Sequence, residues 1–318
     1  MKEYVATRLL LLIPTLLGIT LVVFFAMHAI PGDPIISILG EDYDKNFAAQ
    51  LRAEYGLDQP VIVQYGLWLL RMVQGNWGKS INSHRPVLSD VLYRIPITAE
   101  LIIFALLLAL LIAVPAGVIA STRPYAIRDY SSMTIAMIGI SIPEFFFGIL
   151  LILCFGLLLG WLPTGRFVSL ADSVPQNLVH LILPAVALGF HRAAILTRLV
   201  RSSMLEVIRQ DYVMTARSKG LAERLVVLKH ALKNALIPTV TVVGLQIGFL
   251  IGGAIVVEKV FSIPGLGSYG IDAILARDYP QVQGFIVVAA SVFVLANLLV
   301  DILYAFLDPR IRYEKKGT

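Results

Sequence analysis

Residues 211–238 read DYVMTARSKGLAERLVVLKHALKNALIP and form a basic, amphipathic stretch between two long apolar runs. The pattern predicts two helices. Asp211 is placed to cap the first helix, and Lys219 with Gly220 is placed to end it, because glycine after a helix accepts a positive φ without a Cβ penalty. In the second helix, apolar residues are interleaved with arginine and lysine. Two helices joined at a glycine on the inner side of a membrane are typical of a docking surface for a soluble partner.

The composition is that of a membrane protein. Hydrophobic residues make up 58% of the 318 positions and charged residues 15%, which is unlike a water-soluble domain. Apolar runs long enough to cross about 30 Å of hydrocarbon recur along the chain. We expect six membrane helices, at residues 9–30, 97–121, 132–159, 177–199, 235–257 and 284–306. The single cysteine, Cys154, lies inside an apolar run and excludes an intramolecular disulfide.

The placement of lysine and arginine predicts the orientation. Sixteen of the 26 lie in the N-terminus, residues 122–131, residues 198–233 and the tail after Asp308. Cytoplasmic loops are enriched in these residues, whereas long segments cross the membrane largely regardless of charge. We therefore expect both termini and the 211–238 stretch to be cytoplasmic. The same confinement to loops argues that the net charge of +5 reflects membrane topology and not nucleic-acid binding.

The extracytoplasmic segment, residues 31–95, is predicted to be structured. A turn is expected at residues 31–34 and a helix at residues 46–55, and Pro60 suits the first turn of another helix. A small packed cap without ligand chemistry is the simplest role for this segment. The predicted parts are then residues 1–30, 31–95, 96–306 (with a cytoplasmic loop at 200–235) and 307–318.

Two glycine motifs resemble nucleotide-binding loops without their context. Residues 265–270 fit the spacing G-x-G-x-x-G, which binds dinucleotides only between a strand and a helix of a βαβ unit. Here the motif follows a membrane span, so a tight extracytoplasmic turn is predicted instead. Residues 78–80 resemble the end of a phosphate loop, but Val73 stands where the earlier glycine is required. No catalytic residue and no metal site is predicted.

Two further features point to packing and to the translocation path. Gly244, Gly248 and Gly252 repeat every four residues along one face of the fifth span, with Gly253 beside them. Small residues let membrane helices approach closely, either between two halves of a pore or within one subunit. Glu144 is a charge within the third span, where charges are costly and usually face protein or water, so it is a candidate for the translocation path.

Several motifs together resemble a known family. They are Pro31-Gly32-Asp33-Pro34, Gly56-Leu57-Asp58-Gln59-Pro60, Asp211-Tyr212 with Thr215-Ala216-Arg217-Ser218-Lys219-Gly220, His230-Ala231-Leu232-Lys233-Asn234-Ala235-Leu236-Ile237-Pro238, Gly252-Gly253 with Val256-Val257-Glu258-Lys259-Val260-Phe261, Pro264-Gly265-Leu266-Gly267, and Asp308-Pro309-Arg310. In this order, and over nearly the whole length, they resemble a permease subunit of bacterial ABC importers of the dipeptide/oligopeptide/nickel family. The details are closer to dipeptide and glutathione permeases than to nickel permeases.

The resemblance implies an all-α membrane protein with six transmembrane helices. It implies the type I (MetI-like) importer permease fold, with a helical extracytoplasmic insertion after the first helix, in the bacterial inner membrane. It further implies a second, homologous permease subunit, two cytoplasmic ATPases that bind ATP and magnesium, and an extracytoplasmic solute-binding protein. No cofactor is expected on this chain, and no enzyme activity.

In this family a cytoplasmic EAA loop docks into a cleft of the ATPase. The residues expected at that contact are Asp211, Thr215, Ala216, Arg217, Lys219 and Gly220. Met214 stands where many importers have glutamate, so a salt bridge from this position is not expected. Peptides, including dipeptides, oligopeptides and glutathione, are the implied substrates. A nickel chelate or an oligosaccharide is the alternative, and an ion-coupled secondary carrier is the competing class.

Overall fold

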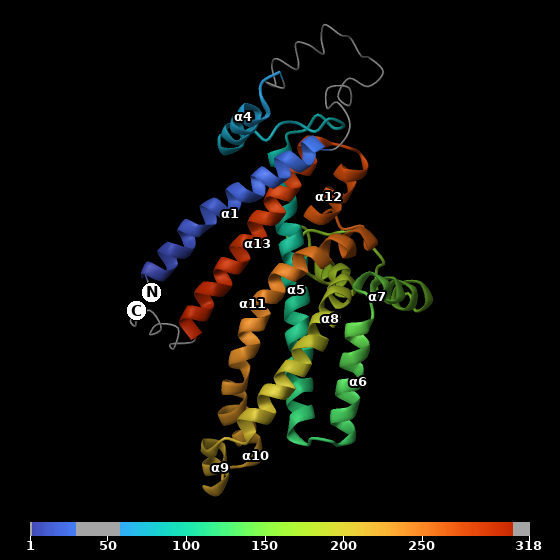
Figure 1. Cartoon of the computed structure of the whole chain (residues 1–318). Coiled ribbons are helices and arrows are strands. Elements are labelled where there is room, and N and C mark those ends of the chain that lie inside the picture. The colour runs from blue at the N-terminus through green and yellow to red at the C-terminus, as the bar shows by residue number, and fades with distance from the viewer. Residues whose placement is uncertain (1, 30–57, 308–318) are drawn as a thin grey trace. The chain divides into compact units, whose positions relative to one another are not determined.

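The computed structural model describes the backbone of residues 2–29 and 58–307, and this part is built almost entirely from helices (Figure 1). In chain order they are α1 (Lys2–Ala29), α4 (Val61–Val73), α5 (Val87–Thr122), α6 (Ile127–Ser141), α7 (Glu144–Leu151), η1 (Ile152–Leu158), α8 (Val174–Ile208), α9 (Asp211–Ser218), α10 (Glu223–Leu225), η2 (Val226–Ala231), α11 (Leu232–Val260), α12 (Leu266–Leu275) and α13 (Tyr279–Leu307). The turn predicted at residues 31–34, the helix predicted at residues 46–55 and most of the tail lie outside the described residues.

The membrane helices agree with the predicted fold class. Five helices are long and apolar enough to cross a membrane, and a bent pair of helices makes a sixth span if it is taken as one. The five lie at Arg8–Ala26, Val87–Thr122, Val174–Ile208, Glu223–Val260 and Tyr279–Leu298. α8 runs beyond the predicted span to Ile208, so the predicted loop at 200–235 begins inside a helix.

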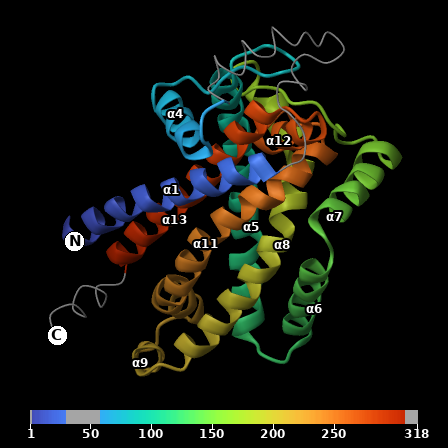
Figure 2. The same ribbon diagram turned by 45° about the horizontal axis from the view of Figure 1, so that its top comes forward.

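The third predicted span is not one straight helix. α6 ends before Ile142, and α7 with η1 continues after Pro143 at an angle of 105° (Figure 2). Proline has no N–H to donate and drives the preceding residue out of the α region. Ile142 accordingly has φ −87° and ψ 125°, an extended conformation. Glu144 therefore lies in the first turn of α7 and not in the middle of a span.

The helices group into two compact units. One contains Met1–Ile97 and Pro264–Leu295, and the other contains Thr98–Ile263 and Ala296–Thr318. In the second unit, α8 packs against α6, α7 and α11. α8 also approaches the part of α5 in this unit through small side chains, Ala109, Ala113 and Ala193. Small residues at such contacts let membrane helices pack by close approach of their backbones.

Gly189 lies at a close approach between α8 and α5. A Cβ built on Gly189 would lie 2.5 Å from the carbonyl oxygen of Ala105, and this neighbour is backbone that cannot rotate away. We expect Gly189→Ala to force the two helices apart and to destabilise the protein by about 1–3 kcal/mol, the usual cost of overpacking. Thermal unfolding of the purified protein measures this as a lower Tm.

Gly252→Ala is the matched control, because none of the residues that the structure describes lies within 4 Å of a Cβ at Gly252. Alanine is a better helix former than glycine, so the control is expected to leave the Tm unchanged or slightly higher. Equal Tm values for the two variants would contradict the close contact at Gly189.

In the first unit, an aromatic cluster joins α1 to α4. The rings of Phe24 and Trp68 have centroids 5.6 Å apart, and Thr20 shares a hydrogen bond of 3.0 Å with the Tyr65 hydroxyl. The helix predicted after Pro60 is confirmed as α4, although Pro60 is the N-cap residue and not part of the first turn. The only part of the 31–95 segment that the structure describes is thus packed helix and loop.

The tight turn predicted at residues 265–270 is wrong. These residues begin α12, with Gly265 as its N-cap residue. Gly270 lies against α13, where an added Cβ would come within 2.5 Å of the Phe285 ring. Gly270 therefore allows close helix packing, and the glycine spacing alone did not distinguish that use from a turn.

Candidate functional site

α9 forms the first part of the 211–238 stretch. Gln210 is its N-cap residue, so the predicted cap at Asp211 is wrong by one position. Asp211 is instead the acidic residue of the first turn, where it favourably faces the positive end of the helix dipole. The predicted end is confirmed: Lys219 is the C-cap residue, and Gly220 follows with φ +75°.

The buried side of α9 packs on the helix that follows it. Val213 and Ala216 form a small core with Val226, and Val207 at the end of α8 packs against it. Tyr212 accepts a hydrogen bond of 2.8 Å from Asn234 in α11. α9 is therefore fixed to the start of the continuous helix Glu223–Val260. Of the residues predicted at the ATPase contact, Ala216 faces this core and the others are exposed.

The exposed side of this region is more apolar than the sequence suggested. Met214 is 56% exposed and Tyr212 43% exposed, and Leu221, Leu225 and Leu228 are also exposed. Arg217 donates a hydrogen bond of 2.7 Å to Glu223 across the glycine turn, and this bond raises the pKa of Arg217 above its ordinary value. Arg217 is thus already paired, and Lys219 is exposed beside these apolar side chains. We call the exposed residues of 211–229 the α9 surface.

A charged cluster lies where the bent span meets α8 and α11. The Nη2 of Arg192 donates to Glu144 Oε1 at 2.9 Å, and its Nη1 donates to Gln246 Oε1 at 3.2 Å. Both charged side chains are mostly buried. A charge within a membrane span is costly unless it is paired, and here three helices supply the partners. The sequence analysis identified Glu144 but not Arg192. The position of an arginine inside an apolar span was the signal that could have identified it.

The glycines of α11 divide between two environments. Gly244 and Gly248 are buried, whereas Gly252 is exposed, and within the described part of the chain no atom lies within 4 Å of an added Cβ. A Cβ on Gly253 would collide with the carboxylate of Glu144. The four glycines therefore do not form one contact face within this chain. The role predicted for them, packing between pore halves or within the subunit, stays a prediction.

A second ion pair holds α6 to α8. Arg201 donates two hydrogen bonds to Asp129, through Nε at 2.5 Å and through Nη2 at 2.7 Å. Asp129 is buried, and it also accepts a hydrogen bond from the backbone N–H of Tyr125. Bidentate pairs of this kind fix orientation as well as distance. The sequence analysis did not identify this pair, because nothing in the spacing shows which helix faces are in contact.

Family models match both parts of the chain. A model described as a binding-protein-dependent transport system inner membrane component matches residues 113–313. A second model, for the N-terminal part of such membrane components, matches residues 1–102.

Relatives of similar length are permease proteins. The dipeptide transport system permease protein DppB of Alkalihalophilus pseudofirmus is 44% identical over 98% of this chain and all of its own length. The oligopeptide transport system permease protein AppB of Bacillus subtilis is 43% identical, with the same coverage. The glutathione transport system permease protein GsiC of Escherichia coli is 45% identical over 99% of this chain and its whole length.

The fold also matches a solved importer. An inward-facing structure of the MetNI methionine ABC transporter superposes with a TM-score of 0.56 at 20% identity, covering 69% of this chain and 96% of the matched chain. This likeness confirms the type I importer permease fold. Together with the family models and the full-length relatives, it shows that the chain belongs to the family of binding-protein-dependent transport system inner membrane components, as a permease subunit.

Proposed function

We propose that this permease subunit forms half of the translocation path of an ATP-driven importer of peptides. Three relatives that match over nearly the whole chain carry names for dipeptide, oligopeptide and glutathione transport. Peptides are therefore favoured over a nickel chelate or an oligosaccharide. The partners are a second, homologous permease subunit, two ATPases that bind ATP and Mg²⁺, and an extracytoplasmic binding protein that delivers the peptide.

The observation that carries the mechanism is the attachment of α9 to the long helix. The Val213–Ala216–Val226 core joins α9 to a helix that continues without a break from Glu223 to Val260. When ATP binding closes the ATPase pair, movement of its docking cleft displaces α9. The displacement passes through the buried core to the membrane helix and switches the path between outward and inward access.

The α9 surface carries the contact with the ATPase in this proposal. Asp211, Thr215, Lys219 and Gly220 are exposed on it, whereas Ala216 acts from beneath as a packing residue. Because Arg217 is paired with Glu223, exposed apolar side chains such as Met214 and Tyr212 supply much of the contact. In this proposal both chain termini and the α9 surface are cytoplasmic, which the lysine and arginine distribution supports.

Uptake by the reconstituted importer tests the proposal. The permease pair, its ATPases and the binding protein are placed in proteoliposomes with radiolabelled dipeptide, oligopeptide, glutathione, nickel chelate or oligosaccharide outside. We expect peptide uptake that requires the binding protein and internal ATP. A Glu→Gln change at the ATPase's catalytic carboxylate should abolish it.

An ion-coupled carrier gives the opposite result. Its uptake persists without the ATPases and collapses when a protonophore dissipates the ion gradient. Uptake of the nickel chelate or the oligosaccharide in place of peptides would retain the importer mechanism and overturn the peptide assignment.

A further inference from the structure

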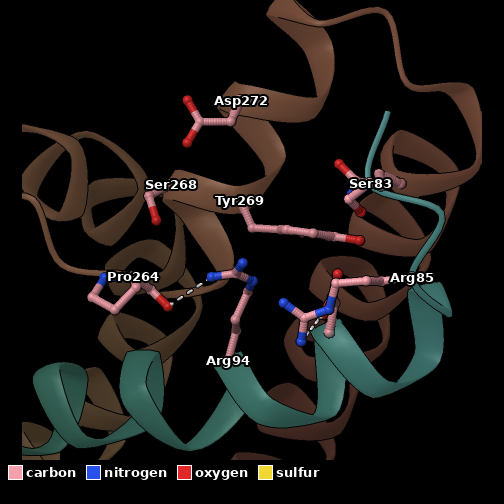
Figure 3. A pocket seen from close by; sticks show the side chains of 9 residues that line it. Ser83, Arg85, Arg94, Pro264, Ser268, Tyr269 and Asp272 are labelled. Carbon is pink, nitrogen blue, oxygen red and sulfur yellow. Dashed lines mark hydrogen bonds and ion pairs between the residues drawn. The ribbon is translucent and has the colours of Figure 1, made fainter. Parts of the chain in front are cut away.

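The first compact unit contains a polar cavity that no step of the transport cycle above uses. Its volume is about 400 Å³, and it lies between the start of α5, the loop before it, α12 and the start of α13 (Figure 3). The lining residues are Ser83, Arg85, Asp90, Arg94, Pro264, Ser268, Tyr269, Asp272 and Gln281. All nine belong to the same compact unit, the one that also contains α4.

A buried carboxylate holds the rim of the cavity together. Asp278 is fully buried and accepts hydrogen bonds from the Ser80 hydroxyl at 2.6 Å and from the backbone N–H of Asn82 at 3.3 Å. The backbone N–H of Gln281 donates to its other oxygen at 3.3 Å. The loop before α5 is therefore tied to the start of α13. Such ties hold the cavity in one shape before any ligand arrives, which lowers the entropic cost of binding.

Arg94 and Tyr269 form the floor of the cavity. The Arg94 guanidinium lies 4.8 Å from the centre of the Tyr269 ring, in cation–π geometry, and its Nη1 donates to the Pro264 carbonyl at 3.2 Å. Figure 3 shows the two side chains stacked, with the guanidinium groups of Arg94 and Arg85 both beneath the tyrosine ring. The Arg94 guanidinium is thus a planar cation whose N–H donors are held in position by the Tyr269 ring and the Pro264 carbonyl.

Two buried donors on this floor lack partners. Within the residues that the structure describes, neither the Tyr269 hydroxyl nor the Arg94 Nε has a hydrogen-bond partner, although both atoms are buried. Tyr269 is only 4% exposed. Leaving a buried donor unpaired is unfavourable, and such groups call for a specific explanation, of which a missing acceptor is the simplest.

The two arginines beside these donors supply the positive charge that an anionic acceptor needs, against the nearby carboxylates of Asp90, Asp272 and Asp278. Arg85 is paired with Asp90 at 2.9 Å, but its side chain is 67% exposed and retains donors for a ligand. The Asp90 carboxylate is buried behind that pair. The Asp272 carboxylate also lines the cavity, and in Figure 3 it lies on the opposite side of Ser268 and Tyr269 from Arg94. Burial, then the charges of Asp90 and Asp278, raise the pKa of Tyr269 above its ordinary value, so the phenol keeps its proton for donation.

We propose that this cavity binds a carboxylate side chain of the extracytoplasmic solute-binding protein, an Asp or Glu received by Arg94, Arg85 and the Tyr269 hydroxyl. The proposal rests on the proposed function, in which both termini are cytoplasmic, so that the 31–95 segment and α12 lie on the extracytoplasmic side. Planar guanidinium donors match a carboxylate in geometry as well as in charge. The rigid, charged cavity of about 400 Å³ suits one fixed side chain, whereas peptide substrates differ in length and side chains.

Affinity of the binding protein for the intact importer in nanodiscs tests the proposal. Arg94→Met is expected to weaken binding by about 30-fold or more, because truncating one partner of a buried charge pair leaves the other unpaired. Tyr269→Phe keeps the ring and removes only the hydroxyl, and should weaken binding about tenfold. Arg277→Met removes a positive charge from an exposed arginine of the same unit that does not line the cavity, and should leave the affinity unchanged.

Further measurements distinguish a specific loss of binding from misfolding of the importer and from an effect on the peptide substrate. ATP hydrolysis without binding protein should be the same in every variant, which shows that the importer is folded. A charge exchange, Arg94→Glu combined with lysine at each acidic surface position of the binding protein in turn, should restore binding for one position. The loss of affinity in Arg94→Met and Tyr269→Phe should also persist when the binding protein carries no peptide, since the carboxylate then cannot come from a peptide.

Unchanged affinity in Arg94→Met and Tyr269→Phe would overturn the proposal, as would an equal loss in Arg277→Met. A loss confined to direct binding of free peptide would identify the substrate's own carboxylate as the ligand and reject the binding protein as its source. If the unaltered importer binds no binding protein at all, the proposed function fails rather than this inference.

Discussion

Arg192→Met is expected to destabilise the protein by about 3–5 kcal/mol and to abolish uptake, because it leaves the Glu144 carboxylate buried without its partner. Gln246 cannot compensate, since it contacts the guanidinium and loses its own donor at the same time. Methionine keeps similar length and packing, so the loss reports the missing charge and not a cavity. Thermal unfolding in detergent and uptake in proteoliposomes measure the two effects.

The double variant Glu144→Gln with Arg192→Met separates stability from transport. With both charges removed, most of the lost stability should return, as it does when buried ion pairs are replaced as a whole. If the pair is needed only for packing, uptake returns with stability. If Glu144 belongs to the translocation path, the double variant is stable and still inactive. A single Arg192→Met variant with unaltered Tm and uptake contradicts the buried pair.

Gly220→Val is expected to uncouple ATP hydrolysis from uptake. Gly220 ends α9 with φ +75°, a conformation that costs a residue with a Cβ about 1–2 kcal/mol and is least accessible to β-branched side chains. The constraint is the backbone angle and not space, because no atom of residues 2–29 or 58–307 lies within 4 Å of an added Cβ. Valine should shift the end of α9, move the α9 surface against the ATPase, and leave hydrolysis without transport.

Gly220→Asn is the matched control, because asparagine tolerates the left-handed conformation better than other residues with a Cβ. It should keep most of the coupling despite its larger side chain. The measurement is the ratio of peptides imported to ATP hydrolysed in proteoliposomes. A wild-type ratio of import to hydrolysis in Gly220→Val would show that the turn does not transmit the movement. Equal decreases of this ratio in the valine and asparagine variants would show that the size of the side chain, and not φ, matters.

Local features of the structure were largely predictable from the sequence. Apolar length located the membrane helices, and the glycine after Lys219 located the end of α9. The break at Pro143 follows from proline chemistry, yet the apolar run on both sides of it favoured a single span. The Gln210 cap differs from the predicted one by a single residue, which is the usual uncertainty of helix boundaries.

Contacts between distant segments were not predictable. Glu144 and Arg192 lie on different helices, and nothing in their spacing shows that α7 and α8 face each other. The cavity depends on Arg94 meeting the Pro264 carbonyl, 170 positions away, and on Tyr269 lying across the guanidinium. Nothing in the sequence around Arg94 or Tyr269 distinguishes them from other arginines and tyrosines, and only the fold brings the two together.

The unbroken helix from Glu223 to Val260 also restricts how the length of this chain can change. One residue added or removed inside a helix rotates everything beyond it by about 100°. Such a change after Glu223 would turn Gln246 away from Arg192 and Gly253 away from Glu144. Insertions and deletions between Glu223 and Gln246 should therefore be rejected.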